Sequence, residues 1–600
     1  MLRRALLLIA LALLGLAGVA SAKLVAEPTP EDPLATGPAA VPTASTATAT
    51  TAPAGTTTRA PTTTAVTSLP TTTRAVPTTA PVTATTTTAP AAAPEPVPAA
   101  SMAALVISGH GWGHGMGMAQ WGADGYAQHG WDYRQILGHY YQGTTIGTQS
   151  APPVRILVAE GRTRVTLASD SPWKVVDAQG ASVSLPAGRV PLTPDLTVNG
   201  KVLASPLTFT PGTAPLLVGK APYRGKLIVL SNGKRLQVVN AVPLESYVLG
   251  VVGREMPSNW PAAALEAQAV AARSYALAEL QNVVTARAFD LYSDTRSQVY
   301  GGIDAESPAV TAAVHATARQ VVLYGGKVAT TYFSSSSGGR TVSAAEAWGK
   351  PVPYLVSVDD PYDTLSPYHD WGPVLVDART AARALKVPGD LVSLSLTAGP
   401  SGHVAQVQAV GTKGEVTVTA STVRSALELR STWFSVGWVA LAAPAEPLAY
   451  GGAAALTGKA QGVAGITLEQ KPTNGTWQPA GTVTPAADGT FSMPIRPSAT
   501  TLYRLAIGST RSAAVQVPVT PAVSATVGTG AVQGSVKPPV AGAAVQLQRQ
   551  SGTSWTTVAT AKTDVAGAFS VAAQLAPGSY RVRCAPGNGL SPGVSQPIEP

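Results

Sequence analysis

The chain has 600 residues, too many for a single hydrophobic core, so we expect three to five separate units. Lys and Arg outnumber Asp and Glu by 41 to 32, a net charge of +9 that suits an anionic wall or membrane surface. The chain has no dense run of Lys and Arg, which argues against nucleic-acid binding. Its single cysteine, Cys584, excludes an internal disulfide and any zinc site built on several cysteines.

The first 22 residues have the composition of a secretory signal peptide. Arg3 and Arg4 form its positive start, residues 5–16 its apolar core, and residues 20–22 (Ala-Ser-Ala) its cleavage site. An uncleaved membrane anchor is the alternative, but the apolar run is short for a span. We therefore expect a secreted protein with no membrane span after cleavage. Export without disulfides also favours a bacterium over a eukaryotic secretory route.

Residues 23–103 consist mainly of Thr, Ala and Pro, as in TASTATATTAPAGTTTRAPTTTAV. Such a segment buries too little apolar surface to offset the entropy lost on ordering. We expect a disordered stalk.

Residues 104–440 are expected to form a mixed α/β core. Its parts are a glycine- and histidine-rich block (104–150), a β-rich part (153–242) and a catalytic part (243–440). Four segments of the β-rich part have strand composition: VRILVAEG, TRVTLAS, KLIVLSNG and RLQVVNAV. The longest helix signal is AAALEAQAVAARSYALAELQ, with Ser258 or Asn259 as the expected cap. Its apolar residues are expected on one stripe: Leu265, Ala269, Ala272, Ala276 and Leu280.

The end of the chain contains an internal repeat, at 445–520 and 521–600. Trp477 and Trp555 lie 78 residues apart, as do Phe491 and Phe569. Short alternating strands with Gly, Asp and Pro turns predict two small β-sandwiches, with both tryptophans in their cores. The predicted fold class is therefore α+β and multidomain: a mixed α/β catalytic core with a β-rich subdomain, followed by two small β-sandwich repeats.

The segment VVGREMPSNWP contains the strongest candidate for chemistry. Glu255 follows an apolar run and precedes the helix, beside Met256 and Trp260. Burial in a groove disfavours the carboxylate anion and raises the pKa, which a general acid requires, although Arg254 opposes this if it faces the same side. The alternative is an ordinary surface glutamate at a loop–helix junction.

Four ordered blocks resemble the stage II sporulation protein D family, also called the amidase-enhancer family. They are NAVPLESYVLGVVGREMPSNWPAAALEAQAVAARSYAL, SDTRSQVYGG, TYFSSSSGGRT and GHGWGHGMGMAQWGADGYAQHGWDYRQILGHYYQGT. The resemblance covers roughly residues 104–440. The last of these blocks stands first in this chain, although it follows the Ser-Gly-Gly block in the founding members. This order looks circularly permuted, so the block must fold back against the groove to complete a site.

The resemblance implies a peptidoglycan lytic transglycosylase that cuts between N-acetylmuramic acid and N-acetylglucosamine, preferably in strands stripped of peptides. The family's proposed catalyst corresponds to Glu255, which would act as acid and then as base to give a 1,6-anhydro product. A hydrolase would need a second carboxylate, for which Asp294, Asp304 and Asp359 stay open. No cofactor is expected.

Ten further residues are expected to bind the glycan, because hydroxyl, amide and aromatic side chains suit a sugar and glycines allow close approach. They are His114, Gln120, Gln268, Tyr275, Gln298, Tyr300, Ser336, Ser337, Gly338 and Gly339. Ordinary alternatives are a Ser/Gly turn and strand-end packing. His110 and His114 have H-x-x-x-H spacing, but the glutamate of a zinc-protease motif is missing. The glycine-rich stretch also lacks the Gly-Lys-Ser/Thr ending of a phosphate loop. We expect no metal site.

The leading hypothesis is thus a secreted, cell wall-associated bacterial enzyme whose partners are peptidoglycan glycan strands, with a cell-wall amidase as a further partner. A non-catalytic wall-binding amidase enhancer is the second hypothesis. An adhesin-like cell-wall scaffold, acting through the stalk and the repeats, is the third.

Overall fold

The computed structural model describes residues 101–281 and 287–600 of the chain. The signal peptide predicted at 1–22 and residues 23–100 of the predicted stalk lie outside these residues. The first described strand, β1 (Ser101–His110), begins within the last three residues predicted for the stalk. In the part of the chain that is described, no helix is long and apolar enough to cross a membrane.

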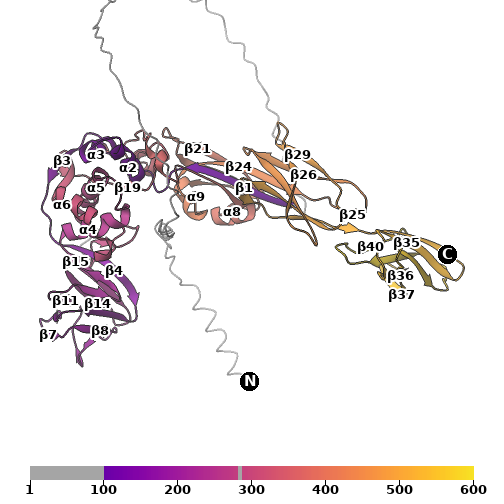
Figure 1. Ribbon diagram of the computed structural model, residues 1–600, viewed down its shortest axis with the longest axis horizontal. Coiled ribbons are helices and arrows are strands. Elements are labelled where there is room, and N and C mark those ends of the chain that lie inside the picture. The colour runs from indigo at the N-terminus through magenta and orange to yellow at the C-terminus, as the bar shows by residue number, and fades with distance from the viewer. Residues whose placement is uncertain (1–100, 282–286) are drawn as a thin grey trace, which may run out of the picture. The chain divides into compact units, whose positions relative to one another are not determined.

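In the described part of the chain, four helices pack around α5 (Ala262–Gln281), the long helix that the sequence predicts (Figure 1). The expectation of a single apolar stripe is wrong. Nearly every side of α5 is buried, because other helices and a small sheet surround it, and its many alanines allow them to approach closely. The surrounding elements are α2 (Gln120–Gln128), α3 (Tyr133–Tyr140), α4 (Leu244–Glu255), α6 (Pro308–Ala316), β3 (Thr145–Thr148), β17 (Gln320–Tyr324) and β18 (Lys327–Val328).

The apolar run before Glu255 forms α4, a helix that the sequence analysis did not predict. Arg273 of α5, which is fully buried, ties the two helices together by donating to both carboxylate oxygens of Glu245 on α4, at 2.9 and 2.8 Å. Pro257 and Pro261 lie between α4 and α5, where their missing N–H groups suit a helix end and a helix start. The helix α5 begins at Ala262, and the carbonyl of Pro261 accepts from the N–H groups of Ala264 and Leu265. The prediction of Ser258 or Asn259 as the cap is therefore wrong, because Pro261 is the residue that directly precedes the helix.

The four strands predicted in the β-rich part are all present: β4 (Val154–Arg162), β5 (Val165–Ser169), β14 (Lys226–Ser231) and β15 (Leu236–Val242). They belong to two sheets, ordered β16-β4-β15-β14-β11-β6-β7 and β13-β12-β5-β8. Buried residues such as Leu167 and Phe209 fill a core of their own. The other strands are β6 (Trp173–Val176), β7 (Ser182–Leu185), β8 (Gly188–Leu192), β11 (Leu207–Thr210), β12 (Leu216–Val218), β13 (Ala221–Tyr223) and β16 (Leu291–Tyr292).

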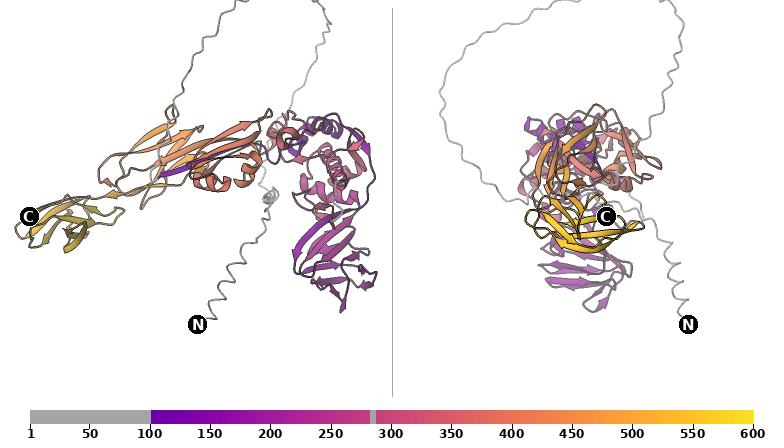
Figure 2. Two further views of the ribbon diagram at one scale, coloured as in Figure 1. Left: turned by 180° about the vertical axis from the view of Figure 1, so that it is seen from behind. Right: turned by 90° about the vertical axis from the view of Figure 1, so that its right-hand side faces the viewer.

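One five-stranded sheet joins the start of the described chain to its later parts. β1 lies between β20 (Asp370–Asp377) and β24 (Trp433–Ala442) and pairs antiparallel with both, so that it runs as an indigo strand among orange ones in Figures 1 and 2. The sheet continues through β26 (Ala454–Gln461) and β29 (Thr490–Ile495) of the first repeat. A single sheet therefore crosses the boundary predicted between the core and the first repeat.

The two faces of β1 contribute to different cores. Ala104 and Val106 pack with residues of the first repeat, and a separate core lies on the opposite face. It joins Leu105 and Ile107 to two helices and a three-stranded sheet, none of which contributes to the core around α5. These elements are α8 (Ala378–Leu385), α9 (Ala420–Ala426), β21 (Leu391–Ala398), β22 (Val404–Gly411) and β23 (Gly414–Thr419).

The two repeats are built from strands, as predicted, but their tryptophans are not core residues. Trp477 and Trp555 are half-buried, and each is covered by an arginine whose Cζ lies 3.9 Å (Arg504) or 4.3 Å (Arg581) from the ring centroid. The first repeat also contains β27 (Ile466–Pro472), β28 (Gln478–Thr482), β30 (Thr501–Ile507), β31 (Thr510–Arg511) and β32 (Val515–Val517). The second has two sheets around one core: β34 (Ala522–Gly528), β35 (Ala531–Lys537) and β38 (Ala568–Ala572), and β36 (Ala544–Ser551), β37 (Ser554–Lys562), β39 (Tyr580–Ala585) and β40 (Gly593–Val594).

Candidate active site around Glu255

Glu255 is the last residue of α4, and its half-buried carboxylate accepts hydrogen bonds from two directions. The backbone N–H of Val299 donates to Oε1 at 2.8 Å. Nε2 of Gln120, the first residue of α2, donates to Oε2 at 3.3 Å. A donor on each oxygen sets the orientation of the carboxylate within the protein.

The segment that carries Val299 can approach α4 closely because α4 has a glycine, Gly253, where the two are in contact. The next residues form a short 3-10 helix, η1 (Gly302–Ala305), which packs on α4. A Cβ at Gly253 of α4 would collide with the carbonyl oxygen of Ala305. The glycine therefore permits the close approach that brings the N–H of Val299 to the carboxylate.

Two predicted site residues of this segment lie inside the protein. Gln298 is 1% exposed and accepts a hydrogen bond from the hydroxyl of Tyr247 at 2.9 Å, while its Nε2 has no partner among the described residues. Tyr300 donates to Oδ1 of Asn240 at 2.8 Å, and burial raises the pKa of its hydroxyl. Both side chains therefore bind partners inside the protein rather than line a surface.

Two predicted site residues of α5 are also buried. Gln268 is fully buried, and neither its Nε2 nor its Oε1 has a hydrogen-bond partner among the described residues, which is uncommon for a buried amide. The ring of Tyr275 lies 5.8 Å from that of Tyr332, and burial raises the pKa of the Tyr275 hydroxyl. Tyr275 is therefore a neutral phenol at physiological pH.

Residues 109–122, the glycine-histidine segment, pair along the backbone with residues 333–339, the serine segment. Trp112 and Ser336 exchange two N–H···O bonds of 2.9 and 3.0 Å, and β2 (Met118–Ala119) pairs parallel with β19 (Phe333–Ser334). The N–H of Trp121 adds a bond of 3.0 Å to the carbonyl of Ser335. The permuted block thus folds back as the resemblance required, and Gln120 reaches Glu255 as a result.

His114 lies within the glycine-histidine segment and is half-exposed. Its Nδ1 accepts a hydrogen bond from the N–H of Met116 at 3.1 Å, so a neutral ring carries its proton on Nε2. The ring meets that of Tyr332 edge-on, with centroids 6.1 Å apart. His114 can therefore act as a hydrogen-bond donor through Nε2.

The serine segment turns its polar groups toward two buried aspartates. Oγ of Ser336 and the N–H of Gly338 donate to Oδ2 of Asp363 at 2.7 and 2.8 Å. Oγ of Ser337 donates to Asp360 at 2.8 Å and accepts from the N–H of Gly339 at 3.1 Å. Ser336 and Ser337 are each 1% exposed, so their hydroxyls hold the turn together rather than line a surface.

The buried aspartates make a stability test possible. Burial and the neighbouring Asp363 raise the pKa of Asp360 from 3.8 to about 7. At a pH between 3.8 and about 7, Asp360 is therefore protonated in the folded chain and ionised in the unfolded chain. The stability that Asp360 contributes through this difference is complete below pH 3.8 and is lost as the pH rises through about 7. We expect the urea midpoint of the wild type to fall more steeply between pH 5 and about pH 8 than that of Asp360→Asn, which lacks the titrating group. Parallel pH dependences in the two proteins would contradict this assignment.

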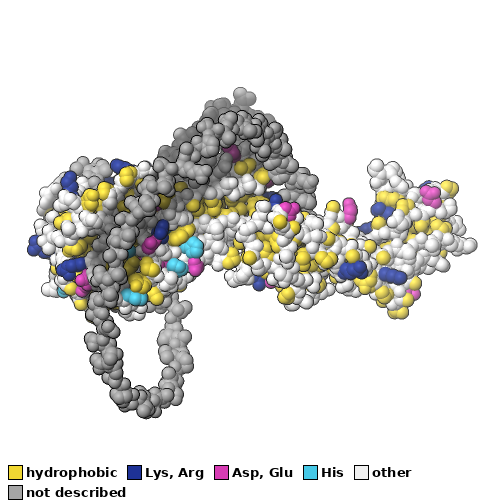
Figure 3. Space-filling model, turned by 90° about the horizontal axis from the view of Figure 1, so that it is seen from above, with side chains coloured by type: hydrophobic (Ala, Val, Ile, Leu, Met, Phe, Trp, Pro, Cys, Tyr) yellow, Lys and Arg dark blue, Asp and Glu magenta, His cyan; other side chains and the backbone are white. Residues whose placement is uncertain are grey.

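Partly exposed aromatic rings lie next to Gln120 and next to the serine segment, and the sequence analysis names only Trp260 among them, as the neighbour of Glu255. Trp121, next to Gln120, packs against Trp260 with centroids 4.8 Å apart. Tyr332 packs against Trp348, which is 50% exposed, at 4.9 Å. On the face shown in Figure 3, histidine side chains lie close to acidic ones, and hydrophobic side chains are spread over the surface. The signal that could have identified these rings is their position directly beside the polar motifs: Trp121 after Gln120, and Tyr332 before the serine segment.

The three aspartates considered as a second carboxylate have other surroundings. Asp294 is paired with Arg296 at 2.7 Å and Asp359 with Arg340 at 2.6 Å. Asp304 is exposed on η1. Within the described residues, no three His, Cys, Asp or Glu side chains come together in a way that could hold a metal ion. The arrangement around Glu255 is suited to proton transfer by one oriented carboxyl group.

Comparisons with known proteins point to the same segment. The sequence profile of the family described as "SpoIID: Stage II sporulation protein" matches residues 232–324, which include α4 and α5. Stage II sporulation protein D of Bacillus subtilis (strain 168) is 30% identical over 213 residues, 33% of this chain and 61% of that protein. The amidase enhancer of the same organism is 39% identical over 114 residues, 19% of this chain and 15% of that protein.

An uncharacterized protein of Brachyspira hyodysenteriae is 41% identical over 136 residues, 23% of this chain and 37% of that protein. The chain therefore spans less than two thirds of the length of each of these relatives.

Proposed function

Because this chain belongs, through residues 232–324, to the stage II sporulation protein D and amidase-enhancer family, we propose that it acts on the bacterial cell wall as a lytic transglycosylase. Its substrate is the bond between N-acetylmuramic acid and N-acetylglucosamine in glycan strands stripped of peptides. Glu255 is the catalytic acid and base. The protein works outside the cell, at the wall.

The reaction needs one carboxyl group in two protonation states. Glu255 first donates its proton to the glycosidic oxygen as the bond to C1 breaks. As a carboxylate it then takes the proton of the muramoyl 6-hydroxyl, whose oxygen attacks C1 and closes the 1,6-anhydro ring. The proton count balances, and no water is consumed.

The observation that carries this proposal is the pair of partners on Glu255. The N–H of Val299 holds one oxygen in place. Gln120 can serve both protonation states, because its amide donates an N–H to the carboxylate and, turned over, offers its carbonyl to the carboxylic acid. A single glutamate with such a partner suits a reaction that uses the same group twice. Arginines hold Asp294 and Asp359, so of the three aspartates considered as the second carboxylate of a hydrolase only Asp304, which is exposed, stays open.

The remaining predicted residues divide into two groups in this proposal. His114, through Nε2, and the rings of Trp121, Trp260 and Tyr332 contact the sugars, because aromatic faces suit the apolar faces of pyranose rings. The other group, whose members are buried or partly buried, supports the site from within: Gln268, Tyr275, Gln298, Tyr300, Ser336, Ser337, Gly338 and Gly339.

The test is product analysis with peptide-free glycan strands. We expect the purified protein to release fragments with 1,6-anhydro-muramoyl ends, measured by mass spectrometry. Fragments with ordinary reducing ends would indicate a hydrolase instead. The name of the amidase enhancer supports a second candidate, a non-catalytic stimulator of a cell-wall amidase. No cleavage by the protein alone, together with faster peptide release by an added amidase, would favour that candidate.

A further inference from the structure

The second repeat presents two arginine–glutamine pairs on the outer face of the sheet β37-β36-β39-β40. Nε of Arg581 donates to Oε1 of Gln548 at 2.9 Å, and Nη1 of Arg583 donates to Oε1 of Gln546 at 3.1 Å. The residues between them, such as Val582, point into the core, so the arginines share the opposite face. They stand two residues apart on β39, about 7 Å along the strand.

The first repeat has the same arginine with a different partner. Nε of Arg504 donates to Oε2 of Glu469 at 2.8 Å, and Glu469 also binds Arg511 at 2.8 Å. The registers correspond, because Glu469 is opposite Arg504 and Gln548 is opposite Arg581. Each arginine also covers the tryptophan of its repeat. The second repeat thus keeps the pose of the arginine but replaces the neutralising carboxylate by a neutral amide.

The positive charge of this face is not balanced by an ion pair with any acidic residue that the structure describes. Arg581 and Arg583 make no ion pair with any described residue, and neither does Lys562, which lies on the same face opposite Ala544. Residues 521–600 contain only two acidic side chains, Asp564 and Glu599. Asp564 accepts from the backbone N–H groups of Ala566 and Ala568, and Glu599 forms no ion pair with a described residue. We call Lys562, Arg581 and Arg583 with Gln546 and Gln548 the cationic face.

We propose that the cationic face binds a linear anionic wall polymer with one phosphodiester group in each repeat unit. Guanidinium groups recognise phosphate oxygens with paired N–H donors, and each arginine here has N–H groups beyond the one given to glutamine. Arg581, Arg583 and Lys562 lie opposite three successive outward-facing positions of β36, namely Gln548, Gln546 and Ala544. Three cations spaced in this way match a chain of regularly spaced charges better than a single small anion. This binding anchors the protein at the wall and is independent of cleavage by Glu255.

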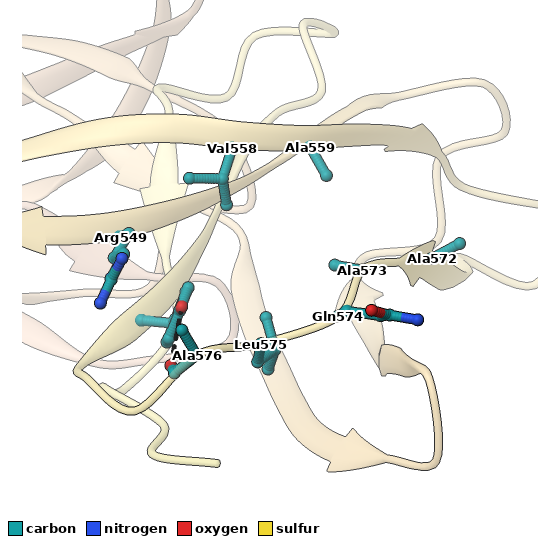
Figure 4. Close-up of a pocket in the computed structure, with 9 residues that line it drawn as sticks. Arg549, Val558, Ala559, Ala572, Ala573, Gln574, Leu575 and Ala576 are labelled. Carbon is teal, nitrogen blue, oxygen red and sulfur yellow. Dashed lines mark hydrogen bonds between the residues drawn. The ribbon is translucent and has the colours of Figure 1, made fainter.

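The pocket of the same repeat is a separate feature. It has a volume of about 290 Å³ and lies between β37 and residues 572–576, with Val558 and Leu575 on either side (Figure 4). Arg549 lines this pocket and lies opposite the buried Tyr580 in the register of β36 and β39. Because residues opposite one another share a face of the sheet, Arg549 does not belong to the cationic face. The pocket and the cationic face are therefore separate features of the second repeat.

The test uses the full chain and purified, lipid-free poly(glycerol phosphate). The double variant Gln546→Glu/Gln548→Glu keeps both arginines and supplies the carboxylates that the first repeat already has. We expect the dissociation constant to rise about tenfold or more, because each new ion pair competes with the polymer phosphates. The thermal midpoint should not fall, since the new pairs copy Glu469 and Arg504.

The control is Gln478→Glu/Gln516→Glu, which changes the net charge equally at exposed positions of the first repeat. We expect it to change the dissociation constant by less than about twofold, because exposed charges at a distance are screened by salt. Equal losses in both double variants would show general charge attraction and overturn the proposal, as would binding that neither variant weakens. Tighter binding of polygalacturonate, a carboxylated glycan, would overturn the phosphodiester as the recognised group.

Discussion

Glu255→Gln is expected to slow the release of anhydro-ended fragments by about 10²- to 10⁴-fold, the range that a positioned general acid and base contributes. The substitution keeps the shape of the side chain and removes its ability to donate and accept the proton. The N–H of Val299 still finds an oxygen on the new amide, so the fold around α4 should persist. The measurement is the initial rate of anhydro-muramoyl formation at saturating glycan.

A matched control is Glu266→Gln on α5, another half-buried glutamate, whose pKa is raised by burial. We expect it to leave the rate within about twofold, because surface substitutions outside a site have small effects. Full activity in Glu255→Gln would remove this residue as the acid. Equal losses in both variants would point to a general effect on the domain.

Gly117→Ala is expected to separate the glycine-histidine segment from the serine segment. Gly117 has φ +66°, and a Cβ there would collide with the carbonyl oxygen of Tyr332, which already accepts from the N–H of Met118 at 3.2 Å. Backbone strain and overlap together should cost about 3 kcal/mol or more. Because β2 leads directly into Gln120, the contact with Glu255 should be lost and cleavage should fall with stability. Thermal unfolding and the glycan assay measure the two effects.

Gly130→Ala separates strain from overlap. Gly130 has φ +85°, but nothing lies within 4 Å of the position that a Cβ would take. The cost should be only that of a left-handed alanine, about 1–2 kcal/mol, with activity retained. Similar midpoints for the two variants would mean that the pairing of the segments does not depend on close approach at Gly117.

The local signals in the sequence predicted individual elements well. Four strands between 154 and 242 and the helix α5 are present because alternation and helix-forming composition act over neighbouring residues. The helix α4 was missed, since its short apolar run reads equally as a buried strand. Trp477 and Trp555 were wrongly placed in the cores, because an arginine on a neighbouring strand covers each ring.

The candidate site shows the same division. Glu255 and Gln120 were both selected from motifs, and the structure brings them together across 135 residues of sequence. The direction in which Ser336 and Ser337 point was not predictable, because it depends on Asp360 and Asp363, which come later in the chain. The burial of Gln298 and Tyr300 likewise depends on their packing against α4 and β15.

By itself the sequence determined the types of residue available for chemistry, most of the strands and the long helix, since these follow from composition and periodicity over a few neighbours. Only the tertiary structure decided which of the chosen side chains meet. Hydroxyls and amides pair with whichever partner folding brings within about 3 Å, and such partners lie far along the chain. The pairing of residues 109–122 with 333–339 is such a long-range contact, and it places Gln120 on Glu255.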